Sequence, residues 1–241
     1  ASKSRGLGDV YKRQVPNSMS LEENRREYRY GNLTRASLLA DPVAQFNLWL
    51  REAIAADLSD PTAMSLATAT PEGCPSQRMV LLKGCDTEGY VFYTNLGSRK
   101  ATELAVNAQV SLHFSWLTLE RQVIVEGRAF PLPRDVVADY FQQRPRASQI
   151  AAWTSQQSAP IASRQALEQQ YRNVMQRFGE GEIPLPDFWG GYRVVPRSIE
   201  FWQGGEHRLH DRLRYGRCQN AGNTGAANAS GDRWEMTRLS P

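Results

Sequence analysis

Four cationic or proton-bearing side chains alternate in the segment FWQGGEHRLHDRLRYGR, residues 201–217. They are Arg208, His210, Arg212 and Arg214, which follow one another at intervals of two. In an extended strand, this period places all four side chains on one face. Neighbouring positive charges repel one another, so a strand that only packs is not expected to carry them. The pattern indicates a face that binds an anionic or reactive ligand.

The structural alternative is a strand whose cations are balanced by nearby carboxylates. Asp211 falls on the opposite face of the expected strand, and Glu206 alone would have to balance three neighbours. We therefore expect a bound anion to supply the missing negative charge.

A second group of cations lies in YTNLGSRKATEL, residues 93–104. Gly97 permits a tight turn after a strand, and Ser98 can cap a helix whose first residues are Arg99 and Lys100. Free N–H groups and the positive end of the helix would join these two cations, which makes an anion site. The alternative is a solvated helix start, and the segment alone does not decide between the two.

The segment SQRMVLLKG, residues 76–84, predicts a strand with Arg78 and Lys83 on either side of an apolar centre. Cations at this spacing usually mark strand ends that reach solvent, so the segment alone favours a structural explanation.

A further candidate phosphate pocket lies in DYFQQRPRASQ, residues 139–149. Tyr140 and Arg144 lie four residues apart and so share one face of a predicted helix. Pro145 restarts the helix and leaves Ser148 in the first turn, where backbone N–H groups are free. The alternative, a helix–helix corner with a surface arginine, is slightly favoured for the segment in isolation.

Other kinds of site are not expected. His207 and His210 point to opposite faces of a strand and have no third ligand nearby, so no metal is predicted. Cys74, Cys85 and Cys218 form no CxxC pair, which argues against a disulfide framework and a zinc site. The glycine pairs precede no helix, and no serine lies in a GxSxG context. We interpret the chain as a cytoplasmic protein of a reducing compartment.

Charge and composition exclude two further classes. The formal net charge is +4, but residues 1–18 hold four basic residues and one acidic residue, which leaves +1 for residues 19–241. A nucleic-acid-binding surface requires a basic field on the folded part, so no nucleic acid is expected. No run of 18 apolar residues predicts a membrane span. Residues 1–18 lack apolar periodicity and are interpreted as a non-native or disordered leader, with a mitochondrial presequence as the alternative.

The remaining residues predict one α+β domain over 19–241. Asp41 and Pro42 begin a helix in which Phe46, Leu50 and Ile54 form a buried stripe, and Pro61 ends it. Further helices are predicted at residues 96–107, 133–144, 145–153 and 161–178. Strand composition with turn punctuation occurs at residues 62–70, 76–84, 90–94, 109–116, 120–130, 188–203, 201–217 and 232–240. Strands at both ends of a helical middle favour a mostly antiparallel barrel with peripheral helices. An Ala/Asn/Gly-rich flexible insertion spans about 218–231.

Several segments together carry a family resemblance. They are RREYRYGNL, RMVLLKG, GYVFYTNLGSRKATEL, TLERQVIVEG, YFQQRPRASQIAAW, PLPDFWGGYRV and IEFWQGGEHRLHDR. This set resembles the pyridoxine (pyridoxamine) 5′-phosphate oxidase family from about Arg25 to Arg217, and the resemblance resumes at WEMTRLSP. It implies a homodimeric FMN-binding split barrel that oxidises pyridoxine or pyridoxamine phosphate to pyridoxal phosphate and reduces O2 to H2O2.

The resemblance also implies the site residues, motif by motif. The expected FMN contacts are Arg78, Met79, Val80, Leu81, Leu82, Lys83, Tyr93, Thr94, Arg99, Lys100, Gln122, Gln157, Ser158, Trp202 and Arg212. The expected substrate contacts are Arg25, Tyr28, Lys83, Tyr140, Arg144, Ser148, Arg208 and His210. Of these, Arg208 and His210 are expected to act on the reacting ring, and residues 25–28 to fold over the site as a lid.

Two other functions remain open at this point. A related split-barrel flavin oxidoreductase could act on another ring, and it would bind flavin without converting B6 vitamers. A non-enzymatic module could bind pyridoxal phosphate or nucleic acid without consuming oxygen. Two phosphorylated ligands, FMN and the vitamer, nevertheless account for two separate groups of anion-binding residues, and the flavin carries the redox chemistry.

Overall fold

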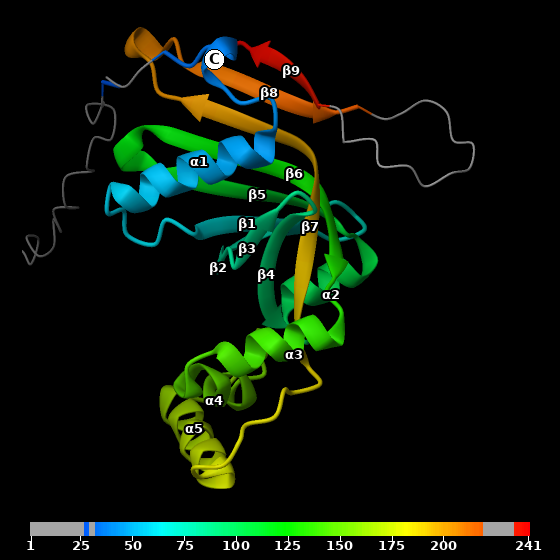
Figure 1. Ribbon diagram of the computed structural model, residues 1–241. Coiled ribbons are helices and arrows are strands. Elements are labelled where there is room, and N and C mark those ends of the chain that lie inside the picture. Colours follow the sequence, from blue (N-terminus) through cyan, green and yellow to red (C-terminus); the bar gives the residue numbers. More distant parts are fainter. Residues whose placement is uncertain (1–26, 29–31, 219–233) are drawn as a thin grey trace, which may run out of the picture.

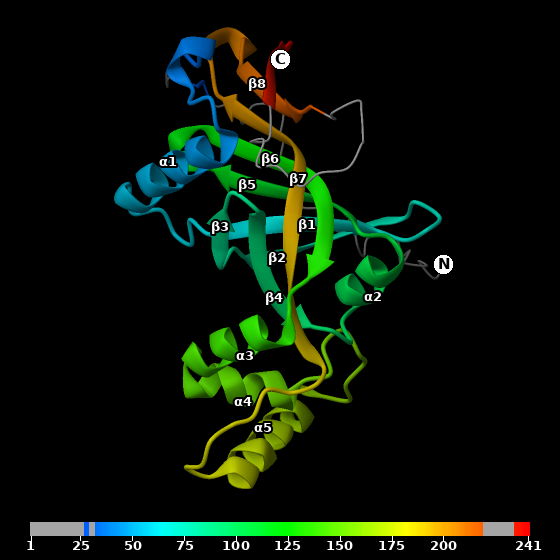
Figure 2. The same ribbon diagram turned by 45° about the vertical axis from the view of Figure 1, so that its right-hand side comes forward.

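A computed structural model describes residues 27, 28, 32–218 and 234–241 of the chain (Figures 1 and 2). The predictions for residues 1–18, for Arg25 and for residues 219–231 of the insertion lie outside the described residues.

The described strands form one antiparallel sheet that curls around a core (Figure 1). The order of neighbouring strands is β2-β1-β5-β6-β7-β4-β3, and β8 pairs with both β7 and β9. The first half of β7 pairs with β4 and its second half with β8, so this strand joins the two ends of the molecule. The strands are β1 (Ala63–Ala69), β2 (Pro75–Leu81), β3 (Gly84–Asp86), β4 (Gly89–Asn95), β5 (Gln109–Trp116), β6 (Arg121–Pro131), β7 (Trp189–Gln203), β8 (Asp211–Arg217) and β9 (Trp234–Leu239).

The helices lie outside the sheet, as Figures 1 and 2 show. The α-helices are α1 (Pro42–Ala55), α2 (Arg99–Val106), α3 (Arg134–Gln143), α4 (Arg146–Thr154) and α5 (Arg164–Phe178), and short 3-10 turns are η1 (Arg35–Ser37), η2 (Leu117–Leu119) and η3 (Glu206–Arg208). The predicted class, a mostly antiparallel barrel with peripheral helices, is confirmed.

Helix α1 covers one face of the sheet. Its start is the predicted one, because the Asp41 carboxylate accepts a hydrogen bond from the Val43 N–H at 2.9 Å. Phe46 and Trp49 are buried against aromatic rings of the sheet, and burial of a side chain of this size contributes about 1.5–3 kcal/mol. The predicted burial of Ile54 is wrong, since 55% of this residue is exposed.

The buried row of α1 does not include Ile54. The buried face follows residues at spacings of three and four through Val43, Phe46, Trp49 and Ala53, and this row turns away from Ile54. The helix also ends at Ala55, before Pro61, because Asp57 adopts a positive φ of 53°.

The strand predicted to begin before Arg208 starts later. Between β7 and β8 the chain turns through η3, where His207 and Arg208 have φ values of 53° and 63°. Strand β8 begins only at Asp211. Arg208 and His210 therefore lie in a turn, and the predicted four-residue face is wrong.

Candidate functional site

A cavity of about 680 Å³ lies among β2, β4, α2, α3, α4 and the loop after α4. Most of the expected site residues line it. These are Arg78, Met79, Val80, Leu81, Lys83, Tyr93, Thr94, Arg99, Lys100, Tyr140, Arg144, Gln157 and Ser158. Thus segments that are far apart in the sequence meet at one surface, as the anion-site interpretations of residues 93–104 and 139–149 expect.

Leu82 and Ser148 lie near lining residues in the sequence but do not line this cavity themselves. Leu82 is 5% exposed and packs in the core below β2. Ser148 is the third residue of α4, where its own backbone N–H bonds the Pro145 carbonyl at 2.8 Å.

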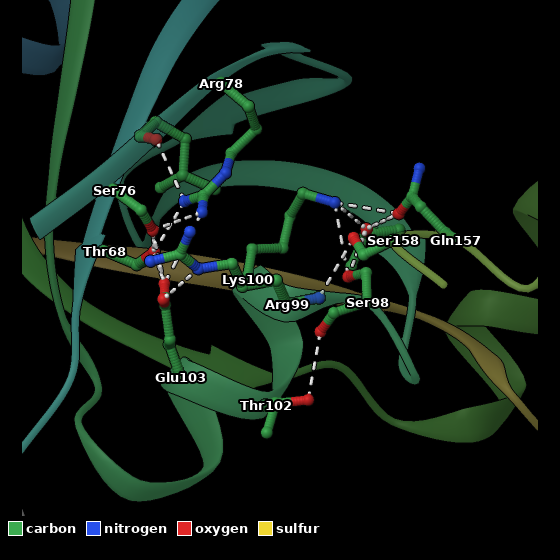
Figure 3. Close-up of polar contacts among 12 residues, drawn as sticks. Thr68, Ser76, Arg78, Ser98, Arg99, Lys100, Thr102, Glu103, Gln157 and Ser158 are labelled. Atoms are coloured by element: carbon green, nitrogen blue, oxygen red, sulfur yellow. Dashed lines mark hydrogen bonds and ion pairs between the residues drawn. The ribbon is translucent and has the colours of Figure 1, made fainter. Parts of the chain in front are cut away.

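Lys100 is a buried ammonium group with neutral partners. Its Nζ donates to Gln157 Oε1 at 2.8 Å, to Thr94 Oγ1 at 3.0 Å and to Ser98 Oγ at 3.2 Å (Figure 3). Burial, and then the charge of Arg78, lower the pKa of Lys100 from 10.5 to about 8. A cation without a carboxylate partner at a cavity wall is suited to an anionic ligand.

Arg99 and Arg78 both contact the carboxylate of Glu103. The Arg99 Nε donates to Glu103 Oε1 at 2.8 Å, and Arg78 Nη2 lies 3.5 Å from Glu103 Oε2 (Figure 3). Thr68 Oγ1 also donates to this carboxylate, as does Ser76 Oγ at 2.7 Å.

The start of α2 differs from the expected cap. The Ser98 side chain makes no capping hydrogen bond and binds Lys100 instead. Ser158, at a positive φ of 74°, accepts a hydrogen bond from the Arg99 N–H at 3.2 Å. A loop 59 residues further along the chain thus supplies the oxygen at the first turn of the helix.

Stacked rings form another part of the cavity wall. The Tyr93 and Tyr140 rings lie 3.9 Å apart at 11°, and the Trp189 ring lies 5.4 Å from Tyr93 at 4°. The Arg144 guanidinium carbon lies 4.6 Å from the centroid of the Trp189 ring. Arg144 is the residue that ends α3, not a residue within it as predicted.

Arg144 also has an unused donor. Its Nη1 is buried and has no hydrogen-bond partner within the described residues. Burial lowers the pKa of Arg144 from its usual value, while Tyr140 acts in the opposite direction. Because burial raises the pKa of Tyr140, its phenol stays protonated and can donate. A buried unpaired guanidinium N–H is costly, which points to an acceptor from a ligand.

The remaining expected residues lie elsewhere. Gln122, Trp202 and Arg212 are register partners across β6, β7 and β8 and so form one row. Arg212 is paired with Glu200 through two hydrogen bonds of 2.7 and 3.2 Å, a diagonal contact across two strands. The assumption that only Glu206 and Asp211 could balance these cations is wrong, because β7 supplies Glu200.

Next to this row lies the turn cluster, defined here as Tyr28, Trp202, Arg208 and His210. The Tyr28 ring contacts His210 edge-on at 5.1 Å and Trp202 at 5.6 Å, and Arg208 is exposed. Figures 1 and 2 both place β8 at the opposite end of the sheet from α3. The turn cluster does not line the 680 Å³ cavity.

Two glycines shape the turn cluster. A Cβ on Gly204 would lie 2.5 Å from the Tyr28 ring, and a Cβ on Gly205 would lie 2.3 Å from the Leu209 carbonyl oxygen. The Gly205 N–H also donates to His210 Nδ1 at 3.2 Å. The glycine pair therefore lets a ring and a carbonyl approach the backbone closely.

Sequence reasoning missed several residues of the cavity region. Glu103 lies four residues after Arg99, which is the spacing of a helical ion pair and was the available signal. Nothing local in the sequence distinguishes Trp189, Thr68 or Ser76. Among the residues described, no group of three or more His, Cys, Asp or Glu side chains could hold a metal ion, and no helix has the length and apolar character needed to cross a membrane.

Comparison with known proteins identifies relatives along nearly the whole chain. The family model described as Pyridoxamine 5'-phosphate oxidase matches residues 50–178. The model described as Pyridoxine 5'-phosphate oxidase C-terminal dimerisation region matches residues 189–241. The pyridoxine/pyridoxamine 5'-phosphate oxidase of Pseudoalteromonas translucida is 55% identical over 223 residues, which are 92% of this chain and 100% of the relative. The enzyme of the same name from Hahella chejuensis is 54% identical over 224 residues, with the same coverage.

Solved structures agree with the fold. The crystal structure of PhzG from Burkholderia lata 383, in complex with tetrahydrophenazine-1-carboxylic acid, has a TM-score of 0.79 at 28% identity and covers 90% of this chain and 100% of that one. A pyridoxamine 5'-phosphate oxidase-related, FMN binding protein from Nostoc punctiforme has a TM-score of 0.62 at 15% identity, covering 81% of this chain and 97% of that one, and supports the fold alone. Two matching family models, and relatives more than half identical over 92% of the chain, show that it belongs to the pyridoxine/pyridoxamine 5'-phosphate oxidase family.

Proposed function

We propose that this protein is the FMN-dependent oxidase that converts pyridoxine 5'-phosphate and pyridoxamine 5'-phosphate to pyridoxal 5'-phosphate. Pyridoxine phosphate loses two hydrogens from its 4′ hydroxymethyl group, and O2 takes them up to give H2O2. Pyridoxamine phosphate loses two hydrogens in the same way, and water then replaces its nitrogen, which leaves as ammonia. Identity of 53–55% to oxidases of this name over 92% of the chain supports this assignment.

The observation that carries the proposal is the cavity with its two sets of phosphate-binding groups. Arg78, Arg99 and Lys100 come from β2 and α2, whereas Lys83 and Arg144 come from other segments of the same wall. FMN and the vitamer each carry one phosphate, so an enzyme that holds both needs two such groups.

The residues present fit FMN. Within the described residues the Lys100 ammonium has neutral partners, and Ser158 and Gln157 lie beside it at the start of a helix, where a phosphate is favoured. We assign the flavin phosphate to Arg78, Arg99 and Lys100. Bound FMN would supply the two-electron acceptor and the reaction with O2.

We assign the substrate phosphate to the other set. Arg144 offers its unpaired Nη1, Tyr140 offers a protonated phenol, and Lys83 is exposed at the cavity. Ser148 lies four residues after Arg144 and three residues before Ala151, both of which line the cavity, and it stays a proposed contact. These groups would anchor the vitamer and thereby set the position of its reacting carbon.

The turn cluster would complete the site from a second chain. A homodimer is supported by the match of residues 189–241 to a model named for dimerisation. Arg208 and His210 would then orient the pyridine ring of the substrate held by the partner, and Gln122, Trp202 and Arg212 would contact its flavin. Tyr28 and Arg25 would cover the ring.

A cytoplasmic location stays a prediction from the cysteines.

Incubation of the purified protein with FMN and each vitamer phosphate tests the proposal. We expect a yellow protein that forms the aldehyde with matching oxygen uptake. A yellow protein that is inactive on both vitamers would instead favour a flavin oxidoreductase for another ring. A protein that takes up no FMN would overturn the proposal altogether.

A further inference from the structure

Glu103 is a buried carboxylate surrounded by the cations of the cavity, and the proposed reaction gives it no role. Its side chain is 7% exposed, yet that of Arg99, one turn earlier on α2, is 61% exposed. Glu103 does not line the 680 Å³ cavity. Figure 3 shows its carboxylate beside the Thr68 and Ser76 hydroxyls and the guanidinium groups of Arg78 and Arg99.

The groups around Glu103 bind its own carboxylate. Burial acts to raise the pKa of Glu103, but hydrogen bonds from Thr68, Ser76 and Arg99 outweigh it and lower the pKa to about 2. A buried carboxylate is retained only when its oxygens are paired in this way. Glu103 is therefore a fixed negative charge rather than a ligand-binding group.

The hydroxyl groups tie this charge to Arg78. Ser76 Oγ accepts from Arg78 Nη2 at 2.6 Å and donates to Glu103 at 2.7 Å. Thr68 Oγ1 accepts from Arg78 Nη1 and donates to the same carboxylate oxygen. In the described part of the chain, Arg99 uses only Nε, so its two Nη groups stay available.

We propose that Glu103 is a positioning residue that fixes the guanidinium groups of Arg78 and Arg99, so that the two Nη groups of Arg99 can bind the flavin phosphate. This inference rests on the proposed function, since it assumes that FMN binds in the cavity. It adds Glu103, Thr68 and Ser76 as a layer that supports the phosphate-binding arginines.

Charge and position predict opposite signs for a neutral variant. A negative charge behind the arginines repels a phosphate, so its removal would strengthen FMN binding through charge alone. Loss of the hydrogen bond to Glu103 would let the Arg99 side chain move among rotamers. FMN binding would then have to order this side chain, and the entropy cost would lower the affinity for FMN. The Arg99 side chain is mostly exposed, and in the part of the chain that the structure describes Nε is its one hydrogen-bonded group, so we expect position to dominate.

The test is Glu103→Gln in the full-length chain, with affinities for FMN and riboflavin measured by quenching of flavin fluorescence. Riboflavin carries the same ring without the phosphate. We expect FMN affinity to fall about threefold to tenfold, the effect of ordering one long side chain, and riboflavin affinity to stay unchanged. Glu168→Gln is the matched control, because Arg164 and Glu168 form the same i,i+4 pair at 2.8 Å on exposed α5.

The outcomes separate the possible roles. Equal weakening of FMN and riboflavin would show a structural role, and tighter FMN binding would show an effect of charge; either result overturns the inference. If Glu103→Gln does not fold, Ser76→Ala removes the hydroxyl that joins Arg78 to Glu103 and should weaken FMN selectively to a smaller extent; unchanged FMN affinity there would overturn it too. Failure of the unchanged protein to bind FMN would overturn the proposed function itself.

Discussion

The cavity and the turn cluster differ in how completely one chain builds them. The cavity draws residues from strands, helices and a loop, encloses about 680 Å³, and has cations that are fixed by hydrogen bonds to side chains of the same chain. The turn cluster lies at the other end of the sheet, and its Arg208 is exposed. One chain thus brings the proposed phosphate-binding residues together but places the proposed ring-orienting residues at the other end of the sheet.

Exposed apolar residues occur beside both regions. Met79 and Leu81, at the cavity, are 66% and 44% exposed, and Leu209, in the turn, is 71% exposed. Contiguous exposed apolar patches mark surfaces that meet a partner, whereas single exposed apolar side chains are ordinary. The difference between the regions is explained if each is half of a site that a second copy completes.

Complementation between two damaged chains gives the largest expected effect. Arg144→Ala damages the cavity and Arg208→Ala damages the turn, so each homodimer should lose about tenfold or more of the wild-type kcat/KM. In a purified heterodimer, one of the two sites receives both intact halves, and activity should return to about half of wild type. Differently tagged, co-expressed chains allow this measurement. Heterodimers as inactive as their parents would place both residues in one chain's site.

Loss of a phosphate-binding cation should have the next largest effect. Arg78→Ala and Lys100→Ala each remove a charge-assisted hydrogen bond, which corresponds to roughly 1.5–3 kcal/mol of FMN affinity. Flavin titration of the apoprotein measures it, with Arg172→Ala on exposed α5 as the control. Unchanged affinity in both variants would remove the flavin phosphate from this wall.

Substitutions in the turn cluster should separate catalysis from flavin binding. Arg208→Ala and His210→Ala should leave the protein yellow and folded, but lower kcat/KM by about tenfold or more, at least ~1.4 kcal/mol of transition-state stabilisation. Steady-state kinetics at saturating FMN, together with flavin content, check this. An Arg208→Ala protein that loses flavin, yet turns over normally once FMN saturates, would assign the turn to the cofactor.

The pH dependence of FMN binding should report on Lys100. The lowered pKa of about 8 means that the free protein carries a charged Lys100 only below that pH. A bound phosphate favours the ammonium form, so binding above pH 8 requires proton uptake. Affinity should therefore fall as pH rises through 8, by at most about tenfold per unit. Lys100→Met should abolish this slope, and a slope that persists in it must come from another group.

The smallest effects are expected from the N-terminal segment. Tyr28→Ala removes a ring that contacts Trp202 and His210, and should raise KM about twofold to fivefold by loosening these side chains. Deletion of residues 1–18 should change neither melting temperature nor turnover. Thermal denaturation and kinetics of both variants distinguish the two expectations, and equal effects would contradict them.

Local sequence patterns predicted those elements whose signals are local. The β1–β2 hairpin follows from two strand runs around PEG, and Gly73 supplies the positive φ of 85° that the turn needs. The start of α1 follows from Asp41 and Pro42 in the same way. The start of β8 was missed because the residues after Gly204–Gly205 form a turn, although their sequence still alternates with the two-residue period of a strand.

At the candidate site, too, the sequence predicted local groups but not contacts between distant residues. Cations near a helix start and near Pro145 were found because each group is contiguous in the sequence. Glu103 was missed because its contact with Thr68 joins residues 35 positions apart, and the Arg212–Glu200 pair depends on the register of two strands. Gln122 and Trp202 came only from family resemblance, since neither type nor spacing marks them.

The hydrogen bond from the Gly205 N–H to His210 Nδ1 decides which imidazole tautomer the turn holds. A nitrogen that accepts from a backbone N–H carries no proton, so the neutral ring carries its proton on Nε2. His210 can therefore donate to an oxygen of a ligand but cannot accept a proton at Nε2 in this tautomer. For as long as this bond persists, His210 serves as a hydrogen-bond donor and not as a general base.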